Sequence, residues 1–466
     1  MTPEKQIEEQ AANPLPQYND VPPVRFGEKD DFDREIIADN IIKLLDSNLT
    51  DCYPMAIDGG WGTGKSEFCH KLINKLRDNA ANYKPRNVIY FDAFEAENVE
   101  EPLLSLLAKI TEVVPESERK SVVSKIAPVA LYTGKVIAKG LLSHLFRQNG
   151  DELIDGFSNA LHEEAQKGLD ESIDGLLKQY AQAKNNIEAL RTAIQTALGE
   201  KELVIFIDEL DRCRPDFALN VFELIKHVFD INGVKFIFVF NSEQIKSMIK
   251  NRYGDDVDTE RYIEKFIKMS INIPKIISYH YDIDASLRFY SLKMKELKKE
   301  YLAQKDSFVF KLISEFIKNK NISLRGIEKL IFSINVFCEI RPGNALSNSK
   351  FKITWVLFSI IGVLIFTFDK SIAKKILINS ASKDDFFMFF NVNHVVTSRD
   401  KLSTCQLVSE LIAFEFEKEF PHNTEEERIF EIEIKEFISA LYSHGYPSDG
   451  ALSLIRDTIK TLNFCG

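Results

Sequence analysis

The residues with the clearest chemical meaning lie in one segment, Gly59–Ser66, which reads GGWGTGKS. It matches the pattern G-x-x-x-x-G-K-[ST], whose glycines let backbone N–H groups surround phosphate oxygens without a Cβ in the way. Lys65 supplies a positive charge to the β and γ phosphates, and the Ser66 hydroxyl is a ligand for Mg²⁺. The residues expected to contact ATP are Gly59, Gly60, Trp61, Gly62, Thr63, Gly64, Lys65, Ser66 and Glu67.

A second chemical motif follows the apolar segment 203–207 and begins with Asp208 and Glu209. The apolar run predicts a buried parallel strand, whose carboxyl end brings Asp208 to the crevice beside the phosphate loop. We expect Asp208 to hold Mg²⁺ through water, while Glu209 polarises the attacking water. The alternative is a core strand that ends in an acidic surface turn. Together with Lys65, these residues predict nucleoside-triphosphate hydrolysis.

The elements that position these residues can be read from apolar periodicity. An apolar run at 55–57 precedes the loop, and apolar residues at helical spacing follow it at 68–76, which predicts a strand, a loop and a helix whose N-terminus points at the anion. Further strands are expected at 88–91, 235–240 and 269–273. A strand between the phosphate-loop strand and the acidic strand indicates the additional-strand branch of P-loop ATPases, because nucleotide kinases and small GTPases place these strands side by side. The predicted fold class is therefore α/β, a P-loop NTPase of the additional-strand type, with a helical insertion and an all-α C-terminal domain.

Four residues are further candidates for the γ-phosphate region. Asn241 has two interpretations: it orients the catalytic water, or it is the N-cap of the helix that follows. Arg325 begins a predicted helix and is expected to contact the γ-phosphate, although an ion pair with a nearby glutamate explains it as well. Arg212 and Arg261 are alternative phosphate-sensing or subunit-bridging arginines, each with an ion pair as the competing explanation.

Three segments together resemble the KAP-type P-loop NTPases: the loop 60–66, the block Ile207–Pro215 (IDELDRCRP) and Arg261–Phe266 (RYIEKF). The resemblance covers residues 28–340 and departs from the family at Phe94, where a tryptophan is usual. It implies an ATPase core of the additional-strand type, a helical C-terminal extension and hydrolysis coupled to conformational change. It also implies two settings: many members are anchored in membranes by helices between the two nucleotide motifs, and several bacterial members are associated with phage exclusion.

The chain is expected to contain three parts. Residues 1–27 are polar and rich in proline, which predicts a flexible N-terminal arm. Residues 28–280 predict the P-loop core, with a helical insertion at about 100–200, and residues 281–466 have a helical period almost throughout.

Two apolar segments raise the question of a membrane anchor. Residues 126–146 are interrupted by Pro128, two lysines and a histidine, and residues 353–368 are shorter than the ~20 residues that cross a bilayer. We expect an interfacial or packed amphipathic helix for the first and the central helix of a buried bundle for the second. A membrane-spanning chain is therefore not expected, and peripheral association stays open.

The composition of the 466-residue chain indicates a cytoplasmic globular protein. An excess of 70 acidic over 59 basic residues gives a net charge of -11, which argues against a general nucleic-acid coat but leaves a local basic groove open. The six cysteines include no C-x-x-C pair, so they are expected to be buried thiols rather than disulfides or a zinc site.

Two functions from different classes fit these observations. The first is a Mg²⁺-dependent ATPase whose hydrolysis drives conformational change or nucleotide-dependent assembly into a homo-oligomer, and the family resemblance implies anti-phage defence as its setting. The second is a slowly hydrolysing, nucleotide-gated switch or scaffold that binds a protein or nucleic-acid partner. A small-molecule kinase is a weaker third alternative, because Glu209 and the intervening strand are typical of ATPases.

Overall fold

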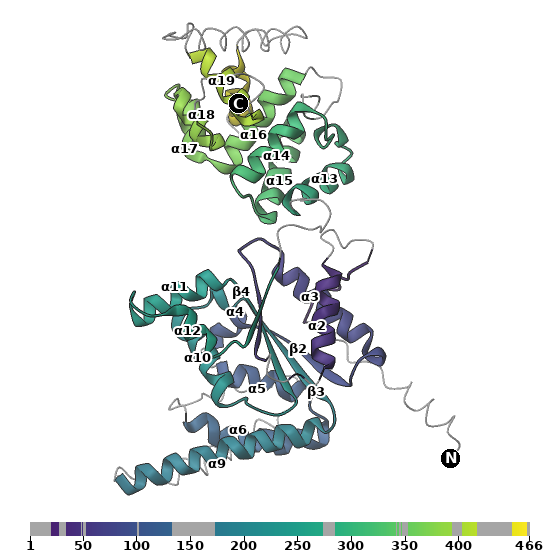
Figure 1. The fold of residues 1–466 in the computed structure, drawn as a ribbon, viewed down its shortest axis with the longest axis vertical. Coiled ribbons are helices and arrows are strands. Elements are labelled where there is room, and N and C mark those ends of the chain that lie inside the picture. Colours follow the sequence, from purple (N-terminus) through teal and green to yellow (C-terminus); the bar gives the residue numbers. More distant parts are fainter. Residues whose placement is uncertain are drawn as a thin grey trace, which may run out of the picture. The chain divides into compact units, whose positions relative to one another are not determined.

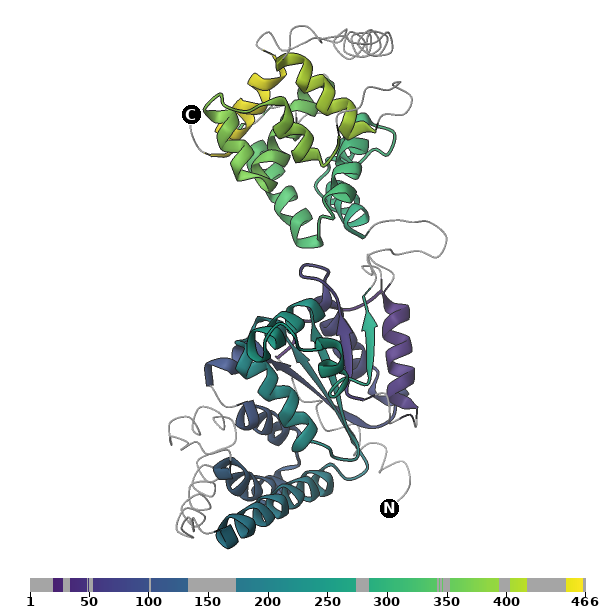
Figure 2. The same cartoon turned by 60° about the vertical axis from the view of Figure 1, so that its left-hand side comes forward.

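The computed structural model divides the chain into two compact units, Met1–Pro274 and Lys275–Gly466. Figure 1 and Figure 2 show an α/β unit and an all-helical unit, and each is described by itself. The described residues are 20–27, 34–47, 49, 53–99, 102–132, 173–273, 285–341, 343, 346, 353–393, 403–416 and 450–463. Most of the arm predicted for residues 1–27 lies outside them.

Residues 20–27, the described end of the predicted arm, pack against helix α3 (Lys65–Asp78). Arg77 forms an ion pair with Asp20 at 2.9 Å between Nη1 and Oδ1. The ring of Phe26 lies edge-on against a phenylalanine ring of α3, with centroids 5.9 Å apart. An ion pair and an apolar contact therefore hold this segment on the helix that follows the phosphate loop.

Among the described residues, five strands form one sheet in which every neighbouring pair is parallel. The strands are β1 (Met55–Asp58), β2 (Arg86–Asp92), β3 (Glu202–Asp208), β4 (Val234–Phe240) and β5 (Met269–Asn272). Their order is β2-β3-β4-β1-β5, so β4 lies between the strand that enters the phosphate loop and the strand that ends in the acidic motif. The predicted fold class is therefore confirmed.

Successive residues of β3 enter two different apolar cores, as expected for a strand that is covered on both faces. Leu203, Ile205 and Ile207 belong to one core, and Val204 and Phe206 belong to the other. The first core contains residues of α5 (Pro102–Val113), α6 (Glu116–Tyr132), α9 (Ile173–Leu198), α10 (Pro215–His227) and α11 (Ser242–Tyr253). The second core contains residues of α2 (Glu35–Asp46) and α3. Figure 1 shows these two helical layers on either side of the sheet.

The shorter segments of this unit are α4 (Ala93–Ala96), α12 (Thr259–Glu264), η1 (Ala80–Asn82), η2 (Glu97–Val99) and η3 (Leu210–Arg212). Of the insertion expected at about 100–200, the structure describes α5, α6 and α9, and residues 133–172 lie outside the described part. Ile126 and Val129 of α6 are buried in the first core, as expected for a packed helix at the start of the segment 126–146. No helix in the described ranges is both long and apolar enough to cross a membrane.

The helical unit is built around α16, which the sequence predicts as a buried central helix. Its helices are α13 (Ala285–Glu296), α14 (Phe308–Asn319), α15 (Leu324–Ile340), α16 (Ile353–Phe368), α17 (Lys370–Leu377), α18 (Lys383–Phe390), α19 (Thr404–Phe416) and α21 (Ala451–Leu462), with a short segment η4 (Glu300–Leu302). Nearly every residue of α16 from Thr354 to Ile365 is buried. At Gly362 the helix touches α21, because an added Cβ would lie 2.7 Å from Thr458 Cβ. The prediction of a buried central helix is confirmed.

The described cysteines are buried thiols. They are Cys69, Cys213, Cys338 and Cys405. Burial raises the pKa of the Cys213 thiol to about 12 and the pKa of Cys69 well above its usual range. The prediction of buried thiols is confirmed for these four, while the cysteines at 52 and 465 lie outside the described ranges.

Candidate active site

The phosphate loop leaves β1 after Asp58 and enters α3 at Lys65. Gly62 and Gly64 have φ of 72° and 82°, a left-handed conformation that glycine adopts at little cost. At Gly59 an added Cβ would lie 2.9 Å from Thr63 Oγ1, and that hydroxyl donates a 2.8 Å hydrogen bond to the Gly60 carbonyl. The loop is therefore wound tightly in a way that side chains at its glycines would obstruct.

The Lys65 ammonium lies inside this loop. Its Nζ donates hydrogen bonds to the carbonyls of Gly59 at 2.7 Å and Gly60 at 3.2 Å. Burial lowers the pKa of Lys65, while the carboxylates of Asp211 and Asp208 act in the opposite direction. The lysine is thus a buried cation held between its own loop and the acidic motif.

Asp208 is the last residue of β3 and is 1% exposed. Its Oδ1 accepts a 2.7 Å hydrogen bond from the Glu209 N–H, and the Tyr90 hydroxyl donates to Oδ2 at 3.4 Å. Burial, and secondarily the neighbouring Glu209, raises the pKa of the Asp208 carboxyl to about 7. Next to this carboxylate, Ser66 Oγ donates to Glu209 Oε1 at 3.5 Å. The fold thus brings Ser66, Asp208 and Glu209 together as the sequence pattern predicts.

The Glu209 backbone has φ of 60°, which is unusual for a residue with a side chain. The turn places its Oε2 at 2.5 Å from Nε of Arg212, which lies in the next segment of the motif. Burial raises the pKa of the Glu209 carboxyl, and Arg212 opposes this effect. Glu209 therefore faces Ser66 with one oxygen and an arginine with the other.

The KAP family P-loop domain matches residues 34–341 of the chain. The chain belongs to the KAP family. No curated protein matches it. Sixteen chains of solved structures do match. One of them is the Aeropyrum pernix ORC2 protein in its ADPNP–ADP complexes, with 11% identity and a TM-score of 0.34 over 95% of this chain and 96% of that chain.

Asp211 lies in the candidate active site of this KAP protein, and the motif patterns alone do not single it out. Its Oδ2 accepts a 2.8 Å hydrogen bond from the indole N–H of Trp61 in the phosphate loop and a 3.1 Å hydrogen bond from the backbone N–H of Asn241. The residue is 4% exposed. One acidic side chain therefore joins the phosphate loop, the acidic motif and the end of β4. The signal that could have found it is the second aspartate of the motif, three positions after Asp208.

Asn241 follows β4, and its side-chain oxygen accepts a 3.2 Å hydrogen bond from the Glu243 N–H at the start of α11. The helix N-cap interpretation of Asn241 is therefore confirmed. The same turn is fixed to β1, because Asp58 Oδ1 accepts from the Ser242 N–H at 2.8 Å. A role in orienting water stays a prediction.

The three candidate arginines of the KAP protein have different surroundings. Arg212 is paired with Glu209, and the largely exposed Arg261 lies 3.3 Å from Asp258 between Nε and Oδ2. Arg325 is an exposed residue in the first turn of α15, and it belongs to the helical unit. The contact predicted for Arg325 with the γ-phosphate therefore stays a prediction.

Two residues predicted for Mg²⁺, Ser66 and Asp208, have the oxygen donors that this ion prefers. In the described ranges no three or more His, Cys, Asp and Glu side chains form a metal cluster. Mg²⁺ in nucleotide sites uses one or two protein oxygens together with phosphates and water, so a hydroxyl and one carboxylate fit it. The carboxylate of Glu67, a residue also predicted to contact ATP, forms an ion pair with Lys71 at 2.9 Å.

Proposed function

We propose that this KAP protein is a Mg²⁺-dependent ATPase that couples hydrolysis to conformational change or assembly. The observation that carries the proposal is the meeting of Ser66 and Glu209, 143 positions apart in the chain, at 3.5 Å beside the buried Asp208. A phosphate cradle on one side and two carboxylates on the other are the groups that phosphoryl transfer to water requires.

Each residue has a defined role in this proposal. Lys65 offsets negative charge on the β and γ phosphates, while Ser66 and Asp208 hold the divalent cation. When bound, Mg²⁺ neutralises charge on the phosphate oxygens. Glu209 orients a water molecule and accepts its proton; burial raises the pKa of its carboxyl, which makes the carboxylate a stronger base.

Asp211 acts in this proposal as a positioning residue. Its carboxylate fixes Trp61 and the Asn241 turn through two hydrogen bonds, and it attracts the Lys65 ammonium. These contacts set the distance between the loop and the end of β4. The geometry of the loop then depends on a residue outside the phosphate-binding motif.

The proposal is tested by Glu209→Gln. We expect ATP turnover to fall by about 100-fold or more, because the general base is lost, while nucleotide affinity changes little. Steady-state phosphate release and nucleotide titration measure the two quantities. Glu243→Gln, on the largely exposed first turn of α11, is the matched control and should leave both unchanged. A wild-type turnover rate in Glu209→Gln would exclude Glu209 as the general base.

One observation favours the second candidate function, a slowly hydrolysing switch. Arg212 lies 2.5 Å from Glu209, and this ion pair competes with a water molecule for the carboxylate. If the switch is correct, Arg212→Ala should raise the turnover rate, because Glu209 is released. If Arg212 instead contacts phosphate, the same variant should lower turnover.

The proposal also includes a biological role and a binding partner. We take anti-phage defence from the resemblance to bacterial KAP members. Plaque counts on cells that express wild type or Glu209→Gln test it, and equal counts in both and in empty cells would remove it. Glu209→Gln loaded with ATP is also the suitable bait for a partner, because it should accumulate the triphosphate state.

A further inference from the structure

The α/β unit contains a cavity of about 610 Å³ at the amino ends of the strands, whereas the phosphate loop follows the carboxyl end of β1. Its lining includes Tyr53 and Pro54, which precede β1, and the residues from Asp230 to Phe236, which lead into β4. The phosphate loop and Asn241 follow the other ends of the same two strands. The cavity is therefore separate from the candidate active site, and its size is that of small-molecule sites.

The lining of the cavity includes buried aromatic side chains. Five phenylalanines contribute to its lining and are each at most 8% exposed: Phe222, Phe229, Phe236, Phe238 and Phe266. They come from α10 and the turn after it, from β4 and from the segment before β5. Because these rings belong to the packed core of the unit, the cavity is formed by the fold rather than by loose surface side chains.

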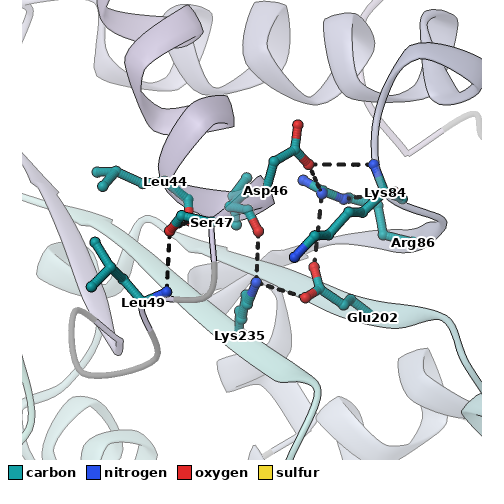
Figure 3. A network of polar contacts seen from close by, with 9 residues as sticks. Leu44, Asp46, Ser47, Leu49, Lys84, Arg86, Glu202 and Lys235 are labelled. Carbon is teal, nitrogen blue, oxygen red and sulfur yellow. Dashed lines mark hydrogen bonds and ion pairs between the residues drawn. The ribbon is translucent and has the colours of Figure 1, made fainter.

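One wall of the cavity is fixed by charge. Lys235 Nζ donates to the Leu45 carbonyl at 2.7 Å and to Glu202 Oε1 at 2.8 Å. Figure 3 shows these contacts beside the ion pair of Arg86 with Asp46, which joins β2 to the end of α2. Lys235 is thus already neutralised, and it serves as a structural residue of the wall.

Three other lysines in the lining are exposed: Lys226, Lys265 and Lys268. Within the described part of the chain none of them forms an ion pair, and Lys226 and Lys265 instead lie over aromatic rings, 5.4 Å and 5.2 Å from the ring centroids. Asp230 is the acidic residue in the lining. The cavity mouth therefore has an excess of positive charge in a chain whose net charge is -11.

We propose that this cavity binds a small phosphorylated molecule. Lysine binds phosphate as a point charge, whereas planar carboxylates are more often recognised by arginine, and the lining contains lysines but no arginine. Lysine is also depleted at protein–protein interfaces, which disfavours an acidic protein partner. The three lysines hold the phosphate groups, and the phenylalanines of the lining contact the remainder of the ligand.

A lysine-reactivity experiment on the full wild-type chain tests this proposal. The protein is acetylated in the presence and absence of pyrophosphate, and each lysine is quantified by mass spectrometry. We expect Lys226, Lys265 and Lys268 to be protected severalfold, while the exposed Lys201 and Lys250 are unchanged. Lys65 is read separately, so binding at the phosphate loop is distinguished from binding at the cavity.

Two variants extend the test. Lys226→Ala/Lys265→Ala/Lys268→Ala should weaken pyrophosphate binding at the cavity by at least about tenfold, because charge-assisted hydrogen bonds are lost. Lys184→Ala/Lys201→Ala/Lys250→Ala removes the same charge at exposed positions elsewhere and should have little effect. Calorimetry with pyrophosphate, in a Lys65→Ala background that weakens binding at the phosphate loop, measures both, and circular dichroism verifies folding.

Three results would overturn the proposal. Equal protection of all five lysines would indicate ionic strength alone, and no protection at millimolar pyrophosphate would exclude the site. Stronger protection of the three lysines by a single-stranded oligonucleotide than by pyrophosphate or a mononucleotide would assign the surface to nucleic acid instead. None of these results bears on hydrolysis at the phosphate loop, so the two proposals fail independently.

Discussion

At the scale of single residues, Asp211 joins more separate parts of the candidate active site than its place in the motif suggests. Its carboxylate accepts hydrogen bonds from Trp61 and from the Asn241 backbone, and it is the carboxylate with the largest effect on the pKa of Lys65. A buried carboxylate with two donors and a nearby ammonium is costly to remove, because each donor is left without its acceptor.

We therefore expect Asp211→Ala to weaken ATP binding by about 10- to 100-fold, the loss of one or two charge-assisted hydrogen bonds. Trp61 reports on this directly, since it and Trp355 are the two tryptophans of the chain. In a Trp355→Phe background, the fluorescence change on adding MgATP gives the affinity. Asp216→Ala, which removes an exposed carboxylate of α10, is the control, and equal affinities in the two variants would show that Asp211 does not position the loop.

The sequence predicts residues that belong to contiguous motifs, and it misses residues whose contacts join distant parts of the chain. Lys65, Ser66, Asp208 and Glu209 belong to contiguous motifs, so their types and spacing are enough to predict that they lie together. The bond of Asp211 to Trp61 joins residues 150 positions apart and depends on the order of strands. The Tyr90 contact to Asp208 depends on the same order, because it requires β2 to lie beside β3.

At the scale of elements, apolar runs predict the strands well, because β3 and β4 are buried on both faces and read as continuous apolar segments. No apolar run or motif in the sequence predicts the cavity at the amino ends of the strands. Its lining combines the turn before β1, the end of α10 and the segment before β5, which only the folded sheet brings together. The almost continuous apolar sequence of α16 also predicts its burial, but it does not reveal which helix Gly362 touches.

The contact between α16 and α21 makes Gly362 sensitive to substitution. An added Cβ would lie 2.7 Å from Thr458 Cβ and 3.0 Å from the Ile455 carbonyl oxygen. We expect Gly362→Ala to destabilise the helical unit by about 1–3 kcal/mol through overpacking. Chemical denaturation measures the change, and Ser380→Ala, an exposed position, should have little effect. An unchanged denaturation midpoint in Gly362→Ala would mean that α16 and α21 can move apart at no cost in stability.

The start of α18 contains an acid-sensitive contact. Asp385 accepts from the Ser382 N–H at 2.8 Å and lies 2.6 Å from Lys375 Nζ. Burial alone would raise the pKa of the Asp385 carboxyl, but these partners lower it below the usual range. The ionised carboxylate is therefore favoured in the folded protein, and its contribution is complete above the unfolded pKa of about 4 and lost as pH falls through the lower folded pKa.

The matching variant is Asp385→Asn. We expect it to cost about 1–3 kcal/mol near pH 7, the range for hydrogen bonds to a charged group. The difference in melting temperature from wild type should be constant from pH 7 to about pH 5. It should shrink below about pH 4, where the Asp385 carboxylate of the unfolded chain becomes protonated, and vanish once the folded carboxylate is protonated as well. A difference that grows on acidification would have the wrong sign and would contradict this assignment.

At the scale of the whole molecule, we expect ATP to promote assembly into a homo-oligomer. Arginines from a neighbouring subunit often complete a γ-phosphate site, and Arg261 is exposed for such a contact, with 83% of its side chain accessible. Light scattering should give a larger mass with a non-hydrolysable analogue than without nucleotide. Arg261→Ala should reduce the effect if this residue bridges subunits, and a monomer in both states would rule out nucleotide-driven assembly.

Each apolar core of the described residues lies entirely within one of the two units. The clusters of the α/β unit contain residues from Val21 to Ile273, and the cluster of the helical unit contains residues from Tyr290 to Leu462. A genetic crossover near position 275 would therefore split no described core. Sequence change in the core of one unit is therefore not constrained by the core packing of the other, so the two cores can vary independently among descendants of this gene.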